Sequence, residues 1–117
     1  MPELSFQSDY CDVKDALGRV MGNQKLLIRM LKMFLGSEEP QRLIIQLENH
    51  ATADAADTAH AIKGIAGNLG MKPLMDISNQ LMEALRHGQP HEALLPLYQE
   101  TLSHTLEDTQ ALLSLLE

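Results

Sequence analysis

The stretch Ala59–Gly70 reads AHAIKGIAGNLG and has the apolar spacing of a helix, yet Gly64 and Gly67 lie inside it. Each interior glycine costs about 0.5–1 kcal/mol relative to alanine, because glycine loses more conformational freedom on folding. The helix is therefore weakened twice on the side that carries His60. We expect the surroundings of this histidine to explain why the helix gives up this stability.

The segment that contains this stretch separates into two sides at roughly 100° per residue. The apolar side, which we expect to face the core, comprises Ala51, Ala55, Thr58, Ile62, Ile65, Ala66 and Leu69. The opposite side comprises Ala53, Ala56, Asp57, His60, Lys63, Gly64 and Gly67. His60 is thus predicted to be exposed in the middle of a helix, among residues with little or no side chain.

The bare face around His60 differs from an ordinary solvated helix face, which would carry long polar side chains. Gly64 and Gly67 lie one and two turns beyond the histidine, so a large partner could approach the ring closely. The alternative is that these glycines allow tight contact between helices within the fold. The spacing favours an open surface, because the apolar residues lie on the other side.

An exposed imidazole beside an ammonium group, with no second catalytic residue, is typical of a phosphoryl acceptor. Lys63 follows His60 by three residues and can offset part of the added negative charge. Phosphoryl transfer depends on positioning and charge neutralisation more than on covalent machinery. No neighbouring side chain is an obvious base for activating water, which favours passing the group on over hydrolysing it.

The rest of the chain predicts further helices joined by short connections. Apolar spacing, caps and breaks place them at 12–22, 23–36, from Ser37 to about 49, 52–70, 73–88 and 90–117, the last with a restart near Pro96. Aromatic residues make up only 3% of the 117 residues, so the core must be aliphatic. We expect one all-α domain with antiparallel long helices.

Charge and cysteine content exclude several classes of function. The formal net charge of −7 argues against binding to nucleic acid or to an anionic membrane. Cys11 is the only cysteine, which excludes an internal disulfide and suits a reducing compartment. No signal peptide or membrane-spanning segment is predicted, so we expect a cytoplasmic protein.

The run HAIKGIAGNLG at 60–70 resembles the signature of histidine-containing phosphotransfer (Hpt) domains: a histidine, an apolar residue, lysine and glycine, then small residues and Asn-Leu-Gly. Residues 12–34 resemble the segment that opens such domains at the C-terminus of hybrid sensor kinases, and residues 81–88 resemble the end of the helix paired with the histidine helix. The resemblance extends over about residues 12–115. It favours a domain excised from such a kinase, which would be the cytoplasmic module of a membrane-bound sensor.

The resemblance implies an antiparallel four-helix bundle with a short accessory N-terminal helix, in which residues 1–11 are irregular and residues 12–117 form the Hpt domain. His60 would carry the phosphoryl group, Lys63 would lie beside it, and Gly64 would admit the partner. Further partner contacts are expected at Asp57, Gly67, Met82 and Arg86. The partner would be a receiver domain whose phospho-aspartate donates to or accepts from the histidine.

The same resemblance implies that the chain is not an enzyme but a monomeric phosphorelay carrier without kinase activity, and no nucleotide-binding loop is visible. Mg²⁺ would belong to the receiver domain, so no cofactor or metal is expected on this chain. Two positions depart from the pattern. Ile65 replaces a smaller residue on the buried side, and Met82 stands where many members carry a polar residue near the histidine, which leaves open what contacts the ring.

Two other functions compete with the carrier. The first is a helical docking module without transfer activity, and an intact His60, Lys63 and Gly64 argue against it. The second is a metal-binding bundle. Asp54 and Asp57 share a helix face with His60, but such a group is far more often plain solvated surface.

Overall fold

The computed structural model describes residues 6–117, which form six helices and no strand. The helices are α1 (Val13–Arg19), α2 (Gln24–Gly36), α3 (Glu39–Glu48), α4 (Thr52–Asn68), α5 (Lys72–Arg86) and α6 (Leu94–Leu116). The first five residues of the predicted irregular segment 1–11 lie outside the described residues, and residues 6–11 contain no helix.

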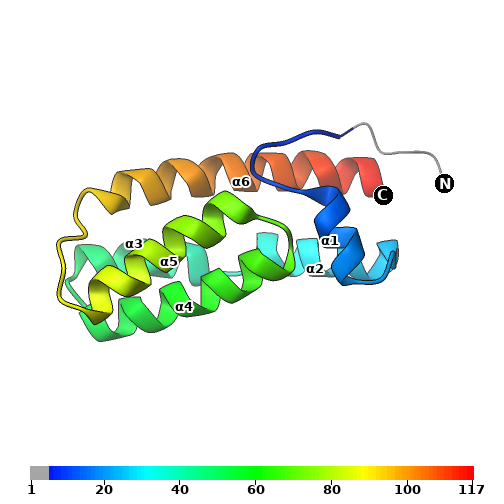
Figure 1. Ribbon diagram of the computed structural model, residues 1–117. Coiled ribbons are helices and arrows are strands. Elements are labelled where there is room, and N and C mark those ends of the chain that lie inside the picture. The colour runs from blue at the N-terminus through cyan, green and yellow to red at the C-terminus, as the bar shows by residue number, and fades with distance from the viewer. Residues whose placement is uncertain (1–5) are drawn as a thin grey trace.

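A closed ring of helix contacts forms the bundle: α3 packs on α4, α4 on α5, α5 on α6, and α6 on α3. Helix α2 also packs on α6 and is separated from α3 only by Ser37 and Glu38, so α2 and α3 together make one side of the bundle (Figure 1). The short α1 packs on α2 at one end of the molecule, which measures 48 × 22 × 20 Å. The predicted four-helix bundle with an accessory N-terminal helix is confirmed.

The first two helices begin at residues whose side chains cap them. Asn23 Oδ1 accepts a hydrogen bond of 3.0 Å from the Leu26 amide at the start of α2, and Asp12 caps α1 in the same way. The predicted restart near Pro96 is wrong, because α6 runs unbroken from Leu94. A proline in the first turn of a helix removes no intrahelical hydrogen bond, so Pro96 is accommodated there.

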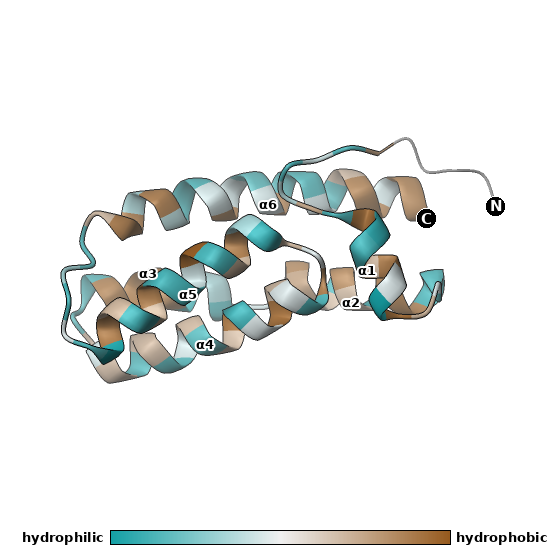
Figure 2. Ribbon diagram, viewed as in Figure 1, coloured by the Kyte–Doolittle hydropathy of each residue, from teal (hydrophilic) through white to brown (hydrophobic). Residues whose placement is uncertain are grey.

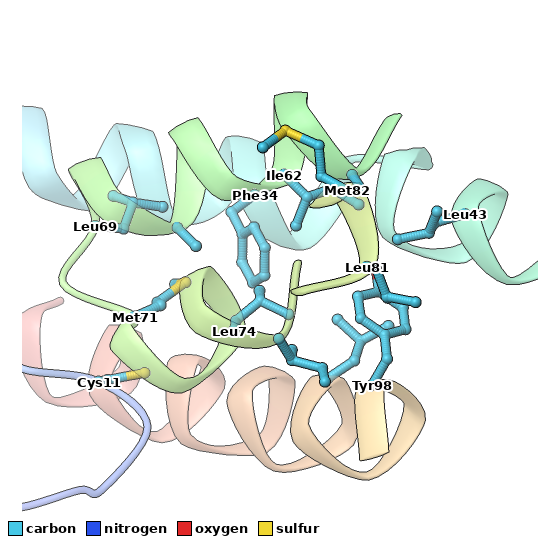
Figure 3. Packing of buried hydrophobic residues seen from close by; sticks show 14 of the residues in the cluster. Cys11, Phe34, Leu43, Ile62, Leu69, Met71, Leu74, Leu81, Met82 and Tyr98 are labelled. Carbon is cyan, nitrogen blue, oxygen red and sulfur yellow. The ribbon is translucent and has the colours of Figure 1, made fainter. Parts of the chain in front are cut away.

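The core is mainly aliphatic and takes residues from all six helices, along which apolar residues recur (Figure 2). Phe34 of α2, Ile62 of α4 and Leu74 of α5 lie together in its centre (Figure 3). Tyr98 is fully buried and donates a hydrogen bond of 2.8 Å to the Pro40 carbonyl oxygen, which joins α6 to α3.

Before α1, residues 6–12 run along α6 and reach the turn between α4 and α5 (Figure 1). Ser8 donates a hydrogen bond to the Asp108 carboxylate, and the Tyr10 ring stacks on His104 with a centroid separation of 5.0 Å. The Asp12 amide then donates a hydrogen bond of 2.9 Å to the Gly70 carbonyl oxygen. This segment therefore ties the end of α4 to α6.

Within residues 6–117, none of the helices combines the length and the apolar character that crossing a bilayer requires.

Candidate functional site

Helix α4 turns its predicted apolar side into the core. Ala55, Ile62 and Ala66 are each at most 1% exposed. The prediction that Ala56 belongs to the bare side is wrong, because its methyl group is buried, as is that of Ala59. Since α4 packs between α3 and α5, its buried arc is wider than a single apolar stripe.

His60 is exposed near the middle of α4, and one edge of its imidazole contacts α5. Its Nδ1 atom lies 3.3 Å from the Sδ atom of Met82, whose side chain is only 3% exposed. Because Nδ1 is turned toward the thioether, Nε2 lies on the edge of the ring that points away from it. The nitrogen that a partner could reach on this exposed residue is therefore Nε2.

Met82 does not lie on the surface as a partner contact would. It belongs to the buried core cluster, and its side chain reaches from α5 to α4 near Ile62 (Figure 3). The sequence-based expectation that Met82 contacts a partner is therefore corrected, because too little of its side chain is exposed for another protein to touch. Met82 contacts the imidazole from behind instead.

A second methionine, Met75, shows how α5 is aligned with α4. A Cβ atom placed on Gly67 would lie 3.2 Å from the Met75 Sδ atom. His60 and Gly67 are seven residues apart on α4, and Met82 and Met75 are seven apart on the antiparallel α5. Two turns of α4 thus face two turns of α5 in one register. The sequence-based reasoning did not place Met75 against Gly67, although its spacing of seven residues from Met82 matches that of Gly67 from His60.

The two glycines of α4 have different surroundings. A Cβ atom on Gly64 would meet nothing within 4 Å, and the residue is exposed. Gly67 is only partly exposed, because Met75 covers it. Gly64 therefore matches the predicted open surface, whereas Gly67 matches the alternative of close packing between helices.

Three charged residues named from the sequence surround the histidine at different distances along the helices. Lys63 is partly exposed one turn after His60, and Asp57 is exposed one turn before it. Arg86 is exposed at the end of α5, one turn beyond Met82. Neither Lys63 nor Arg86 forms an ion pair with a carboxylate among residues 6–117, so both cations are available to a negatively charged group.

Two of the other histidines have contacts of their own, away from His60. His87 contacts Glu83 at the end of α5, and His104 lies against Tyr10 on α6. In the part of the chain that the structure describes, no group of three or more His, Cys, Asp or Glu residues is placed to hold a metal ion. The site consists of one exposed imidazole, its buried thioether neighbour and nearby cations.

Comparison with protein families matches residues 29–116 to the Hpt domain, and the chain belongs to this family. Hpt domains are phosphotransfer carriers in phosphorelay signalling, not autonomous kinases, and they act together with receiver domains. Comparison of the chain with curated proteins and with solved structures gave no match.

Proposed function

We propose that this chain carries a phosphoryl group on Nε2 of His60, taking it from the phospho-aspartate of one receiver domain and passing it to another. The observation that carries the proposal is the imidazole itself. It is exposed, and its Nδ1 edge lies against Met82, which leaves Nε2 as the ring nitrogen turned away from that sulfur. A neutral imidazole nitrogen with a free electron pair is a nucleophile at neutral pH.

The surroundings of His60 suit a large partner and a negatively charged adduct. Gly64 leaves open space one turn beyond the histidine, where a receiver domain could approach. The Lys63 ammonium has no carboxylate partner within residues 6–117, so it can offset charge on the phosphoryl group. Asp57, Gly67 and Arg86 would border the contact.

In the proposed step, the P–O bond of the aspartyl phosphate breaks and its electron pair stays on the carboxylate oxygen. The lone pair of Nε2 forms the new bond to phosphorus. Mg²⁺ would be held by the receiver domain. We place this chemistry in the cytoplasm, on a monomer that is a module of a hybrid sensor kinase.

The test is to mix the chain with a phosphorylated receiver domain and Mg²⁺ and to measure acid-labile, alkali-stable phosphate on the chain. We expect transfer to the natural sequence and none to His60→Gln. His87→Gln is the matched control, because His87 is also exposed but lies at the end of α5. Binding of receivers without transfer would favour the docking module, and transfer that persists in His60→Gln would contradict the proposal.

A further inference from the structure

The contact between His60 and Met82 has a direction that follows from the chemistry of sulfur. A thioether carries lone pairs and no hydrogen, so it can only accept a hydrogen bond. At 3.3 Å from Sδ, Nδ1 is close enough to donate one. If the ring proton were on Nε2 instead, the lone pairs of Nδ1 and sulfur would face each other without attraction.

The sulfur is held in place by its surroundings. Met82 is 3% exposed and packs within the hydrophobic core, so its otherwise flexible side chain has little room to turn away. The burial also restricts water on this side of the ring, which leaves the thioether as the acceptor for Nδ1–H. The buried core of the bundle therefore contacts the reactive side chain through the Met82 sulfur.

We propose that Met82 is a positioning residue for His60. Its sulfur accepts the Nδ1–H hydrogen bond, which keeps the lone pair on Nε2 and holds the ring in the orientation that presents this nitrogen to a partner. The effect on transfer rests on the function proposed above, whereas the tautomer of His60 is a property of the unphosphorylated protein and can be measured without any partner.

This tautomer would allow transfer in both directions without moving a ring proton. When Nε2 attacks phosphorus, the P–O bond breaks toward the carboxylate and the proton stays on Nδ1. When the group leaves, the N–P bond breaks, its electron pair returns to Nε2, and the Nδ1–H form is restored. Met82 would thus keep the carrier ready for the next transfer.

The first experiment is ¹⁵N NMR of the imidazole nitrogens at about pH 8, where an ordinary histidine is neutral. The His60 signals are assigned by their loss in His60→Gln. We expect the natural protein to carry its proton on Nδ1. Met82→Leu, which conserves volume and should fold, is expected to lose this preference. Met82→Gln is expected to keep it, because the amide oxygen can accept the same hydrogen bond.

Met75→Leu is the matched control, since it makes the same exchange seven residues earlier on the face of α5 that meets α4. It should leave the His60 tautomer unchanged. In the transfer assay, Met82→Leu should be about three- to tenfold slower at a saturating receiver concentration, the range that one hydrogen bond supplies. The receiver concentration at half-saturation should not change, and Met82→Gln should restore the rate.

A proton on Nε2 in the natural protein would overturn the proposal, even if Met82→Leu failed to fold. An unchanged tautomer in folded Met82→Leu would overturn it as well. If the tautomer shifts as expected but no receiver phosphorylates the chain, the positioning role of Met82 stands and the proposed carrier function fails.

Discussion

Gly64 and Gly67 lie on the same side of α4 as His60, but a methyl group added at each would meet different atoms. Nothing lies within 4 Å of a Cβ on Gly64, and Met75 Sδ lies 3.2 Å from a Cβ on Gly67. The first glycine therefore weakens the helix without any gain in packing that the bundle itself requires. The second lets Met75 come close to the α4 backbone.

Alanine substitutions should separate these two cases. Gly64→Ala is expected to raise the free energy of unfolding by about 0.5–1 kcal/mol, because it restores helix propensity in open space. Gly67→Ala should gain less or lose stability, since Met75 must shift. Urea denaturation measures both changes, and an equal gain at the two positions would contradict this account.

A longer side chain at Gly64 tests the open surface next to His60. Gly64→Gln should leave the fold intact and slow phosphoryl transfer, because it fills the path by which a receiver domain would approach. Transfer rates and unfolding curves are the measurements. Ala111→Gln, at an exposed position on α6, is the control and should transfer normally. If Gly64→Gln also transfers normally, the glycine does not serve docking.

The connection between α4 and α5 depends on how the segment before α1 packs against it. Gly70 has φ of +69°, and a Cβ atom there would lie 2.5 Å from the Asp12 carbonyl oxygen. The neighbouring hydrogen bond from the Asp12 amide to the Gly70 carbonyl oxygen joins the same two stretches. Only glycine satisfies both the backbone conformation and the close approach.

Gly70→Ala and Gly88→Ala form a matched pair for this connection. Both glycines have positive φ, but a Cβ on Gly88 would meet nothing within 4 Å. Gly88→Ala should cost about 1–2 kcal/mol of stability, the strain of the left-handed conformation. Gly70→Ala should cost about 1–3 kcal/mol more, because backbone atoms must move. Thermal or urea unfolding checks this, and equal losses would refute the role of the contact with Asp12.

At the scale of the whole molecule, a buried phenol joins the neighbouring helices α6 and α3, which are far apart in the sequence. Tyr98 of α6 donates a hydrogen bond to the Pro40 carbonyl oxygen at the start of α3, and burial raises the pKa of Tyr98 above its ordinary value. Ionisation of this hydroxyl would put a charge into the core and remove the donated proton. We therefore expect the packing of α6 on α3 to weaken at alkaline pH.

Stability should fall at high pH for this reason. The unfolded phenol has a pKa of about 10, and the folded one is higher, so the stabilisation is complete below about pH 10 and is lost as the pH rises toward the folded value. Tyr98→Phe should be about 0.5–1.5 kcal/mol less stable at neutral pH. Its stability should then decline less steeply above about pH 10. Urea denaturation measures the free energy of unfolding of both proteins, and an equally steep decline above about pH 10 in the natural protein and in Tyr98→Phe would contradict the prediction.

Much of the fold follows from short-range patterns. Asn23 and Asp12 cap helices at the positions where the sequence predicts that helices start. The apolar spacing of residues 51–69 correctly predicts that His60 is exposed. The helical spacing wrongly assigns Ala56 to the exposed side, because it identifies a single apolar stripe. In the bundle, α4 is covered by both α3 and α5, and Ala56 is buried. Pro96 was misread because only the true start of α6 shows that it lies in the first turn.

Local spacing alone was enough to predict an all-α chain in which an exposed histidine lies near a lysine and near a glycine with free space around it. A helix of 3.6 residues per turn determines which residues share a face without reference to the rest of the fold. What lies behind the imidazole depends on the alignment of two helices, and no local pattern contains it. The tertiary structure sets Met82 against His60 and Met75 against Gly67. The packing of α5 on α4 thereby makes Met82, which the sequence-based reasoning gave as a contact for another protein, a buried neighbour of the histidine.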